Sequence, residues 1–157
     1  MTTLYRPELL YARGGFAEGA GLSVSQGVVV AEGSASSGET VSLPGKALLP
    51  GFVNAHSHSF QRLIRGKSES RLTSGRDFWS WRGTMYHAAA QLDPQDVYDV
   101  ARMAFLEMLL AGTTTVGEFH YLHNAPGGRP YDDPNLLGKQ VIAAAQDRKS
   151  TRLNSSH

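Results

Sequence analysis

The sequence predicts an α/β fold, and three features support this class. Apolar, β-rich runs at residues 52–55 and 113–121 alternate with helical patterns at 93–111 and from Asp133 onward. Strands that alternate with helices are typical of a parallel sheet covered by helices. The composition, 41% hydrophobic with no cysteine, is that of a globular protein without disulfides or thiol ligands. Any metal site would therefore need histidine and carboxylate ligands.

Residues 1–50 predict a small β-rich segment with little core of its own. The alternating residues 22–24 and 28–30 flank Ser25-Gln26-Gly27, which predicts a hairpin. Residues 31–40 are rich in Gly and Ser and predict a polar connection. The next apolar run, 47–55, is interrupted by Pro50-Gly51, so the turn should start a short buried strand that contains the β-formers Phe52 and Val53.

Residues 93–111 give the clearest helical pattern. Asp93 is suited to cap the free N–H groups and Pro94 to the first helical position. Gly112 is suited to end the helix. The apolar side chains recur at helical spacing and form one stripe: Val97, Val100, Ala101, Ala104, Phe105, Met108 and Leu109.

A strand over 113–121, a polar loop over 124–132 and a helix from Asp133-Pro134 follow. A (β/α)₈ barrel needs about 250 residues, whereas this chain of 157 shows two β/α units. It is therefore either a smaller α/β protein or a truncated barrel.

His56 and His58 are the first candidates for chemistry. Residues two apart on a strand point to the same face, so both imidazoles could bind one Zn²⁺ ion at the strand end. The spacing alone is weak evidence, because His-x-His arises often by chance in a chain with 6 histidines. The position of the pair, where a strand meets a loop, is where α/β barrels place their catalytic groups.

Arg82 lies in the aromatic stretch 77–86. Its guanidinium could bind a carboxylate bidentately, or it could be a surface residue stacked on Trp79 or Trp81. His87 and His123 have no partner at ligand spacing and are interpreted as ordinary polar residues.

Four motifs in order resemble the amidohydrolase superfamily and, within it, the deiminase family that converts N-formimino-L-glutamate and water to N-formyl-L-glutamate and ammonia in histidine degradation. They are residues 48–62, 78–82 with Met85-Tyr86, 107–109 with 111–113, and 118–121 with 128–131.

The resemblance implies the amino-terminal part of a distorted (β/α)₈ barrel, over 51–146, preceded by part of a small β-sandwich domain, over 1–50. It implies that His56 and His58 bind Zn²⁺ and that Gln61, Arg82 and Tyr121 bind substrate, with Arg82 on a carboxylate. It also implies that the other zinc ligands and the catalytic acid–base residues lie beyond this chain, so that the truncated chain is expected to be inactive.

Two other functions stay open. One is a different amidohydrolase deaminase, acting on guanine, cytosine or an s-triazine, and the other is a non-catalytic fragment with no function. The chain has fifteen basic and fourteen acidic residues, a net charge of +1. This near-neutral balance argues against a nucleic-acid-binding protein. No membrane span or secretory leader is visible, so we expect a cytoplasmic protein with a small-molecule substrate, no nucleic-acid or membrane partner, and a homodimer at full length.

The last residues, 147–157, differ from what precedes them. Their sequence, DRKSTRLNSSH, matches the translation of a common sequencing-library adapter. We therefore expect this tail not to belong to the natural protein and exclude it from the fold prediction.

Overall fold

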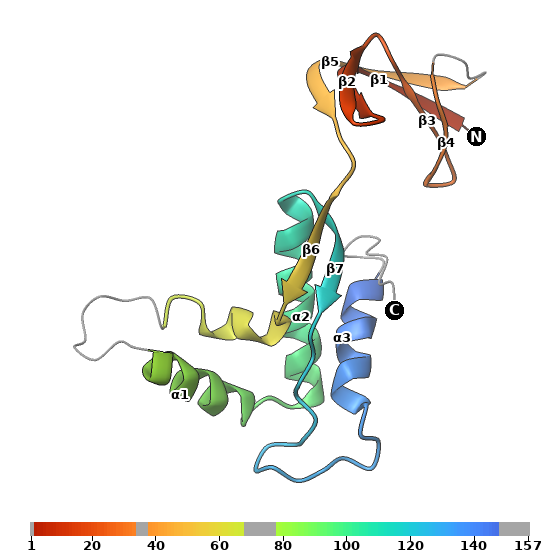
Figure 1. The fold of residues 1–157 in the computed structure, drawn as a ribbon. Helices are drawn as coiled ribbons and strands as arrows, with labels where there is room; N and C mark the ends of the chain where they lie inside the picture. The colour runs from red at the N-terminus through yellow and green to blue at the C-terminus, as the bar shows by residue number, and fades with distance from the viewer. Residues whose placement is uncertain (1, 34–37, 68–77, 148–157) are drawn as a thin grey trace. The chain divides into compact units, whose positions relative to one another are not determined.

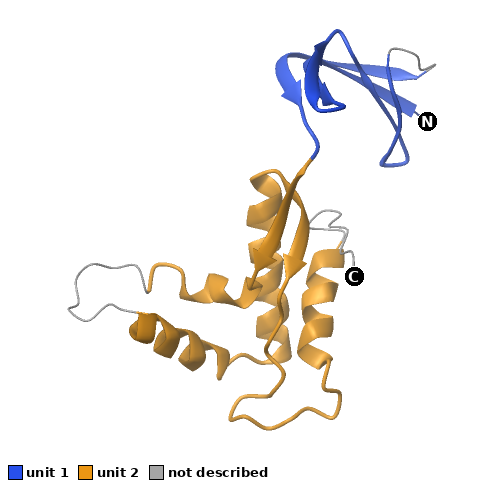
Figure 2. Cartoon of the chain, viewed as in Figure 1, with its two compact units in different colours: residues 1–50 blue, residues 51–157 orange. Residues whose placement is uncertain are grey.

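A computed structural model describes residues 2–33, 38–67 and 78–147 of the chain. The chain forms two compact units, residues 1–50 and 51–157 (Figure 2). Each unit is described by itself. Within the described residues no helix is long and apolar enough to cross a membrane.

Unit 1 is a β-sheet built around its first strand. Its strands are β1 (Thr2–Ala12), β2 (Gly15–Glu18), β3 (Leu22–Ser25), β4 (Val28–Glu32) and β5 (Glu39–Leu48). Strand β1 pairs antiparallel with β2 and β3 and parallel with β5. Its buried apolar side chains are Leu4 and Leu10, so unit 1 has the small core expected from its composition.

The predicted hairpin is confirmed, because β3 and β4 pair antiparallel. The two residues between them, Gln26 and Gly27, both have positive φ, of 51° and 79°. Two such residues are what a tight hairpin turn of type I′ requires. The expected polar connection over 31–40 is too long, because β4 continues to Glu32 and β5 begins at Glu39, and residues 34–37 lie outside the described residues.

Unit 2 contains two parallel strands with helices between and after them (Figure 1). Its elements are β6 (Phe52–Ser57), the 3₁₀ helix η1 (Ser59–Ile64), α1 (Phe78–Ala89), α2 (Pro94–Leu110), β7 (Thr113–Glu118) and α3 (Leu136–Gln146). The parallel pairing of β6 with β7 confirms that this part of the chain has the predicted α/β organisation. The prediction missed η1 and α1.

Helix α2 forms where the sequence predicts it. The Asp93 side chain accepts from the backbone N–H of Asp96, and the Asp96 side chain accepts from that of Asp93, which completes a capping box. Gly112, at φ 87°, follows the helix. Four residues of the predicted stripe are buried, Val97, Ala101, Ala104 and Phe105. Val97, Ala101 and Phe105 pack in one core with residues of η1, α1 and α3.

Three predictions for unit 2 need correction. Phe52 and Val53 form a strand but are 62% and 68% exposed, because no layer of the described residues covers them. Strand β7 ends at Glu118 rather than Tyr121. Helix α3 begins at Leu136 rather than 133, because Asp133 caps a turn in which it accepts the N–H of Asn135 through its side chain and that of Leu136 through its carbonyl.

Candidate metal centre

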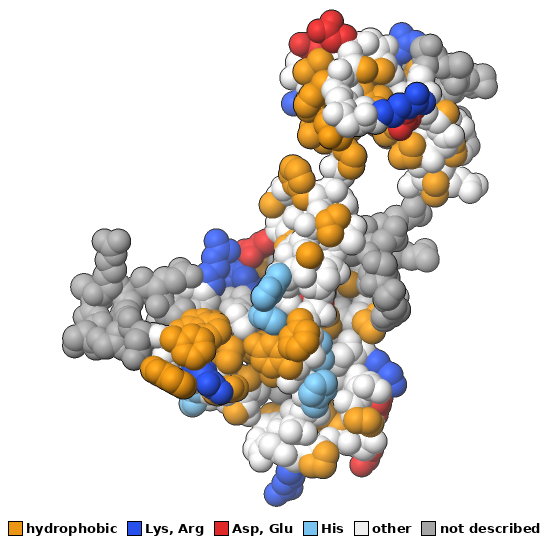
Figure 3. Space-filling model, viewed as in Figure 1, with side chains coloured by type: hydrophobic (Ala, Val, Ile, Leu, Met, Phe, Trp, Pro, Cys, Tyr) orange, Lys and Arg blue, Asp and Glu red, His pale blue; other side chains and the backbone are white. Residues whose placement is uncertain are grey.

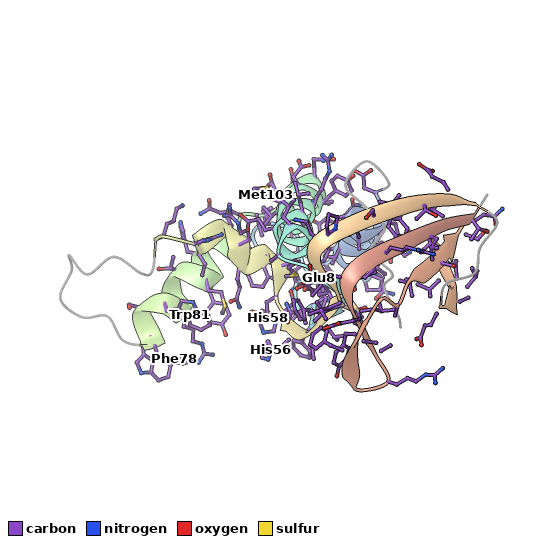
Figure 4. The ribbon with its side chains drawn as sticks, turned by 90° about the horizontal axis from the view of Figure 1, so that it is seen from above. Glu8, His56, His58, Phe78, Trp81 and Met103 are labelled. Atoms are coloured by element: carbon purple, nitrogen blue, oxygen red, sulfur yellow. The ribbon has the colours of Figure 1, made fainter. Side chains whose placement is uncertain are left out.

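The two imidazoles of His56 and His58 converge at the end of β6, as Figure 4 shows. Their Nε2 atoms are 3.1 Å apart, and the ring planes are inclined by 80°. His56 is exposed and His58 is partly buried, while the intervening Ser57 points into the protein and is buried. The period-two alternation of the strand therefore brings both rings to one accessible face.

This geometry fits a zinc ion. Two nitrogens bound at about 2.0–2.1 Å to a tetrahedral Zn²⁺ would be roughly 3.3 Å apart, close to the observed separation of 3.1 Å. Within the described ranges no cluster of three or more metal-binding side chains forms. The described residues therefore offer two candidate ligands, whereas a catalytic zinc site usually has three protein ligands.

The backbone of Phe119 orients His58. The Nδ1 atom of His58 is 2.9 Å from the Phe119 carbonyl oxygen. Because a carbonyl can only accept, Nδ1 carries a proton, and in the neutral ring the lone pair is on Nε2, which faces His56. A carbonyl on the second nitrogen is the usual outer partner of a metal-binding histidine.

Gln61 and Tyr121 lie next to the histidine pair and contact one another. The Gln61 amide donates to the Tyr121 hydroxyl at 2.8 Å, and the Tyr121 ring lies 5.0 Å from that of His58, centroid to centroid. Both polar groups also reach the sulfur of Met85, at 3.3 Å and 3.4 Å. Helix η1, α1 and the segment after β7 thus each supply one member of this cluster.

A pocket of about 350 Å³ opens beside this cluster. Its walls include Phe60, Met85, Tyr86 and Tyr121, so it is mostly apolar and aromatic. In Figure 3, histidine side chains lie next to hydrophobic ones on the visible face of unit 2. A mostly apolar pocket with a few polar groups is typical of a small-molecule site.

Arg82, on α1, is stacked between two aromatic rings. Its guanidinium carbon lies 5.6 Å from the centre of Trp79 and 5.2 Å from that of Tyr86, and it donates twice to the Tyr86 hydroxyl. The stacking on Trp79 corresponds to one of the two alternatives from the sequence. None of the ion pairs among the described residues involves Arg82.

The other histidines do not join this centre. The Nε2 atom of His87 is 2.7 Å from the amide nitrogen of Gln91. His120 Nε2 is 2.6 Å from the carbonyl oxygen of Leu122, and the His120 ring lies 5.6 Å from that of His123. Burial lowers the pKa of His120, an effect that the bond to Leu122 partly opposes. His120 is therefore neutral near pH 7.

Comparison with known proteins identifies the family. The sequence profile of the amidohydrolase family matches residues 47–146, which include both histidines and the whole candidate site. The chain belongs to the amidohydrolase family. Among curated amidohydrolase relatives, formimidoylglutamate deiminase of Pseudomonas aeruginosa is 44% identical over 101 residues, or 64% of this chain and 22% of that protein.

Other amidohydrolases are also similar to this chain. 8-Oxoguanine deaminase of the same bacterium is 36% identical over 81 residues, or 52% of this chain and 17% of that enzyme. The chain thus spans about a fifth of the length of these curated relatives. The chain is therefore similar to amidohydrolases whose names give different substrates.

Solved amidohydrolase structures share the fold. The crystal structure of an amidohydrolase from Brucella melitensis matches with a TM-score of 0.78 and 33% identity, over 91% of this chain and 32% of that one. Atrazine chlorohydrolase of Arthrobacter aurescens, solved in complex with zinc, matches with a TM-score of 0.74 over 98% of this chain and 34% of that one. At 23% identity, the second match supports the fold alone.

Sequence reasoning missed three groups of this site. Met85 occurs in a family motif, but no local pattern indicates that its sulfur meets Gln61 and Tyr121. The Phe119 contact uses a backbone carbonyl, which has no sequence signal. Glu118 binds Ser59, and strand alternation alone could not decide whether Glu118 points inward.

Proposed function

We propose that this chain is the amino-terminal part of a zinc-dependent deiminase that hydrolyses N-formimino-L-glutamate to N-formyl-L-glutamate and ammonia. The convergence of the His56 and His58 Nε2 atoms carries the proposal, because it would form half of a zinc site. Tyr121, whose ring contacts that of His58, lines the neighbouring pocket. The 44% identity to a formimidoylglutamate deiminase supports this substrate. Water adds to the formimino carbon, the carbon–nitrogen bond breaks, and the nitrogen leaves as ammonia.

His56 and His58 would hold the zinc ion. When bound, zinc supplies Lewis-acid activation of a water molecule near neutral pH. The Phe119 carbonyl keeps the His58 proton on Nδ1, so the lone pair on Nε2 stays directed at the site. His56 is exposed and can place its own proton on Nδ1, which leaves its Nε2 free to bind as well.

Gln61, Tyr121 and Arg82 would orient the substrate. The Gln61 amide and the Tyr121 hydroxyl already contact each other next to His58, so they can present a donor and an acceptor to the polar end of a ligand. The Arg82 guanidinium has N–H donors left after its two bonds to Tyr86. Its stacking on the Trp79 ring limits its motion. Such a guanidinium suits a carboxylate of the glutamate moiety.

The remaining parts of the active site would come from the rest of the protein. Two imidazoles are fewer than the three protein ligands of a typical catalytic zinc. The chain also spans 22% of the length of the formimidoylglutamate deiminase. We infer that the further ligands and the groups that move protons lie outside these 157 residues and that the chain alone is inactive.

A second candidate substrate class is a planar nitrogen heterocycle. The aromatic rings of Phe60, Tyr86 and Tyr121 in the pocket wall favour it, because such a ring can stack on them. The similarity to an 8-oxoguanine deaminase also supports it. The Arg82 guanidinium, which forms no ion pair with another described residue, favours the dicarboxylate instead.

Ammonia release by the purified full-length protein tests these proposals. The protein is stripped of metal, reloaded with zinc, and assayed with N-formimino-L-glutamate, 8-oxoguanine and an s-triazine. We expect zinc-dependent release from N-formimino-L-glutamate, with kcat/KM at least tenfold above that for either heterocycle. Turnover of a heterocycle alone would favour the second class, and no zinc-dependent turnover of any of them would contradict both.

A further inference from the structure

The carboxylate of Glu118, the last residue of β7, is bound to Ser59. Glu118 Oε1 accepts the backbone N–H of Ser59 at 2.6 Å and its hydroxyl at 2.7 Å. Ser59 is 4% exposed and directly follows His58. The second oxygen, Oε2, is buried and has no hydrogen-bond partner among the described residues. A carboxylate kept in such a place needs a functional or structural reason.

The end of β7 holds residues 57–59 at four points. Besides the two bonds from Ser59 to Glu118, the Phe119 carbonyl is 2.9 Å from Nδ1 of His58, and the Phe119 N–H donates to the Ser57 carbonyl at 2.9 Å. Glu118 and Phe119, at the end of β7, thus hold residues 57–59, at the end of β6. The backbone therefore has little freedom between His58 and the first turn of η1.

We propose that Glu118 is a positioning residue of the metal centre, which acts through Ser59 to hold His58 in the orientation that binds zinc. By fixing the N–H of Ser59, Glu118 sets the start of η1, and the first turn of η1 carries Gln61. The inference rests on the proposed zinc site. It adds a residue that the sequence-predicted site of His56, His58, Gln61, Arg82 and Tyr121 lacks.

The contacts assign Glu118 to positioning rather than to metal binding. Its Oε1 atom is occupied by two short bonds to Ser59. Glu118 also forms no metal-binding cluster with the two histidines in the part of the chain that the structure describes. We therefore assign the effect of Glu118 on zinc to the residues that it holds.

Glu107 provides a matched control at the other end of η1. Its carboxylate accepts two bonds from Arg62, at 2.6 Å and 2.8 Å, and contacts Arg65 at 3.3 Å. It anchors the same short helix to α2 and touches neither histidine. Loss of Glu107 should loosen η1 without releasing His58.

The experiment measures zinc affinity by chelator competition in the full-length protein, with circular dichroism to verify folding. Glu118→Ala should weaken zinc binding by about 10- to 100-fold, the usual effect of losing an outer-shell partner. Glu118→Gln retains an oxygen acceptor for Ser59 and should restore affinity to within about threefold. Glu107→Ala should also stay within about threefold of the unaltered protein.

Equal weakening in Glu118→Ala and Glu107→Ala would overturn the inference, because the effect would then be general destabilisation. Unchanged affinity in Glu118→Ala would overturn it as well. If Glu118→Ala does not fold, Ser59→Ala decides: it removes only the hydroxyl bond and should weaken zinc binding severalfold, and no change would refute the proposal. Absence of zinc binding in the unaltered protein would instead refute the proposed function itself.

Discussion

The Nδ1 atom of His58 lies 2.9 Å from the carbonyl oxygen of Phe119, although 61 residues separate them in the sequence. This contact joins the ends of two parallel strands, β6 and β7. It also fixes which nitrogen of His58 carries the proton, and so which nitrogen can bind a metal. The candidate metal centre therefore depends on strand pairing as much as on its two histidines.

His58→Ala should remove zinc from the full-length protein. The substitution deletes one of the two converging nitrogens, so the loss of affinity should exceed the roughly 100-fold typical of losing an outer-shell partner. His87→Ala is a suitable control, because His87 contacts Gln91 instead. Elemental analysis of both dialysed proteins checks the prediction, and full zinc occupancy in His58→Ala would contradict it.

Arg82→Met should weaken turnover of the dicarboxylate substrate while leaving zinc binding unchanged. Loss of a charge-assisted contact costs about 1.5–3 kcal/mol, which corresponds to roughly 10- to 100-fold in kcat/KM. Arg13→Met, which removes the partner of Glu32 in unit 1, is the matched control. A kcat/KM equal to that of the unaltered protein would show that Arg82 is only a stacked surface residue.

The 157-residue chain by itself should show neither a sharp cooperative unfolding transition nor tight zinc binding. Phe52 and Val53 are largely exposed, and β6 has one strand neighbour among the described residues. Such a sheet leaves an edge unpaired. Two imidazoles are also too few for metal binding to stabilise the fold substantially. Thermal unfolding followed by circular dichroism, with and without zinc, tests this, and a sharp transition with stoichiometric zinc would contradict it.

Stability should fall in acid partly because of Glu107. Its hydrogen bonds from Arg62 hold the pKa of Glu107 below its ordinary value, against the opposing effect of burial. A carboxylate with a lowered folded pKa contributes stability above its unfolded pKa, which is about 4.3, and loses it as pH falls through the folded value. In urea unfolding of the full-length protein between pH 7 and pH 3, Glu107→Gln should therefore show a smaller loss than the unaltered protein. An equal loss of stability in the two proteins would contradict this prediction.

Local features of the structure could be predicted from sequence, because they depend on residues a few positions apart. The cap at Asp93, the apolar stripe of α2 and the β3–β4 hairpin each follow from a short-range pattern. The common face of His56 and His58 likewise follows from the alternation of a single strand.

Contacts between distant segments depended on the tertiary structure. Gln61 meets Tyr121 and Met85, and Ser59 meets Glu118, only because the parallel pairing of β6 and β7 brings their ends together around η1 and α1. The exposure of Phe52 was not predictable either, since a β-forming side chain is buried only where another layer covers it. Local sequence thus determines the helices, strands and turns, because they depend on neighbouring residues. Tertiary packing determines which polar side chains lie together in the candidate site.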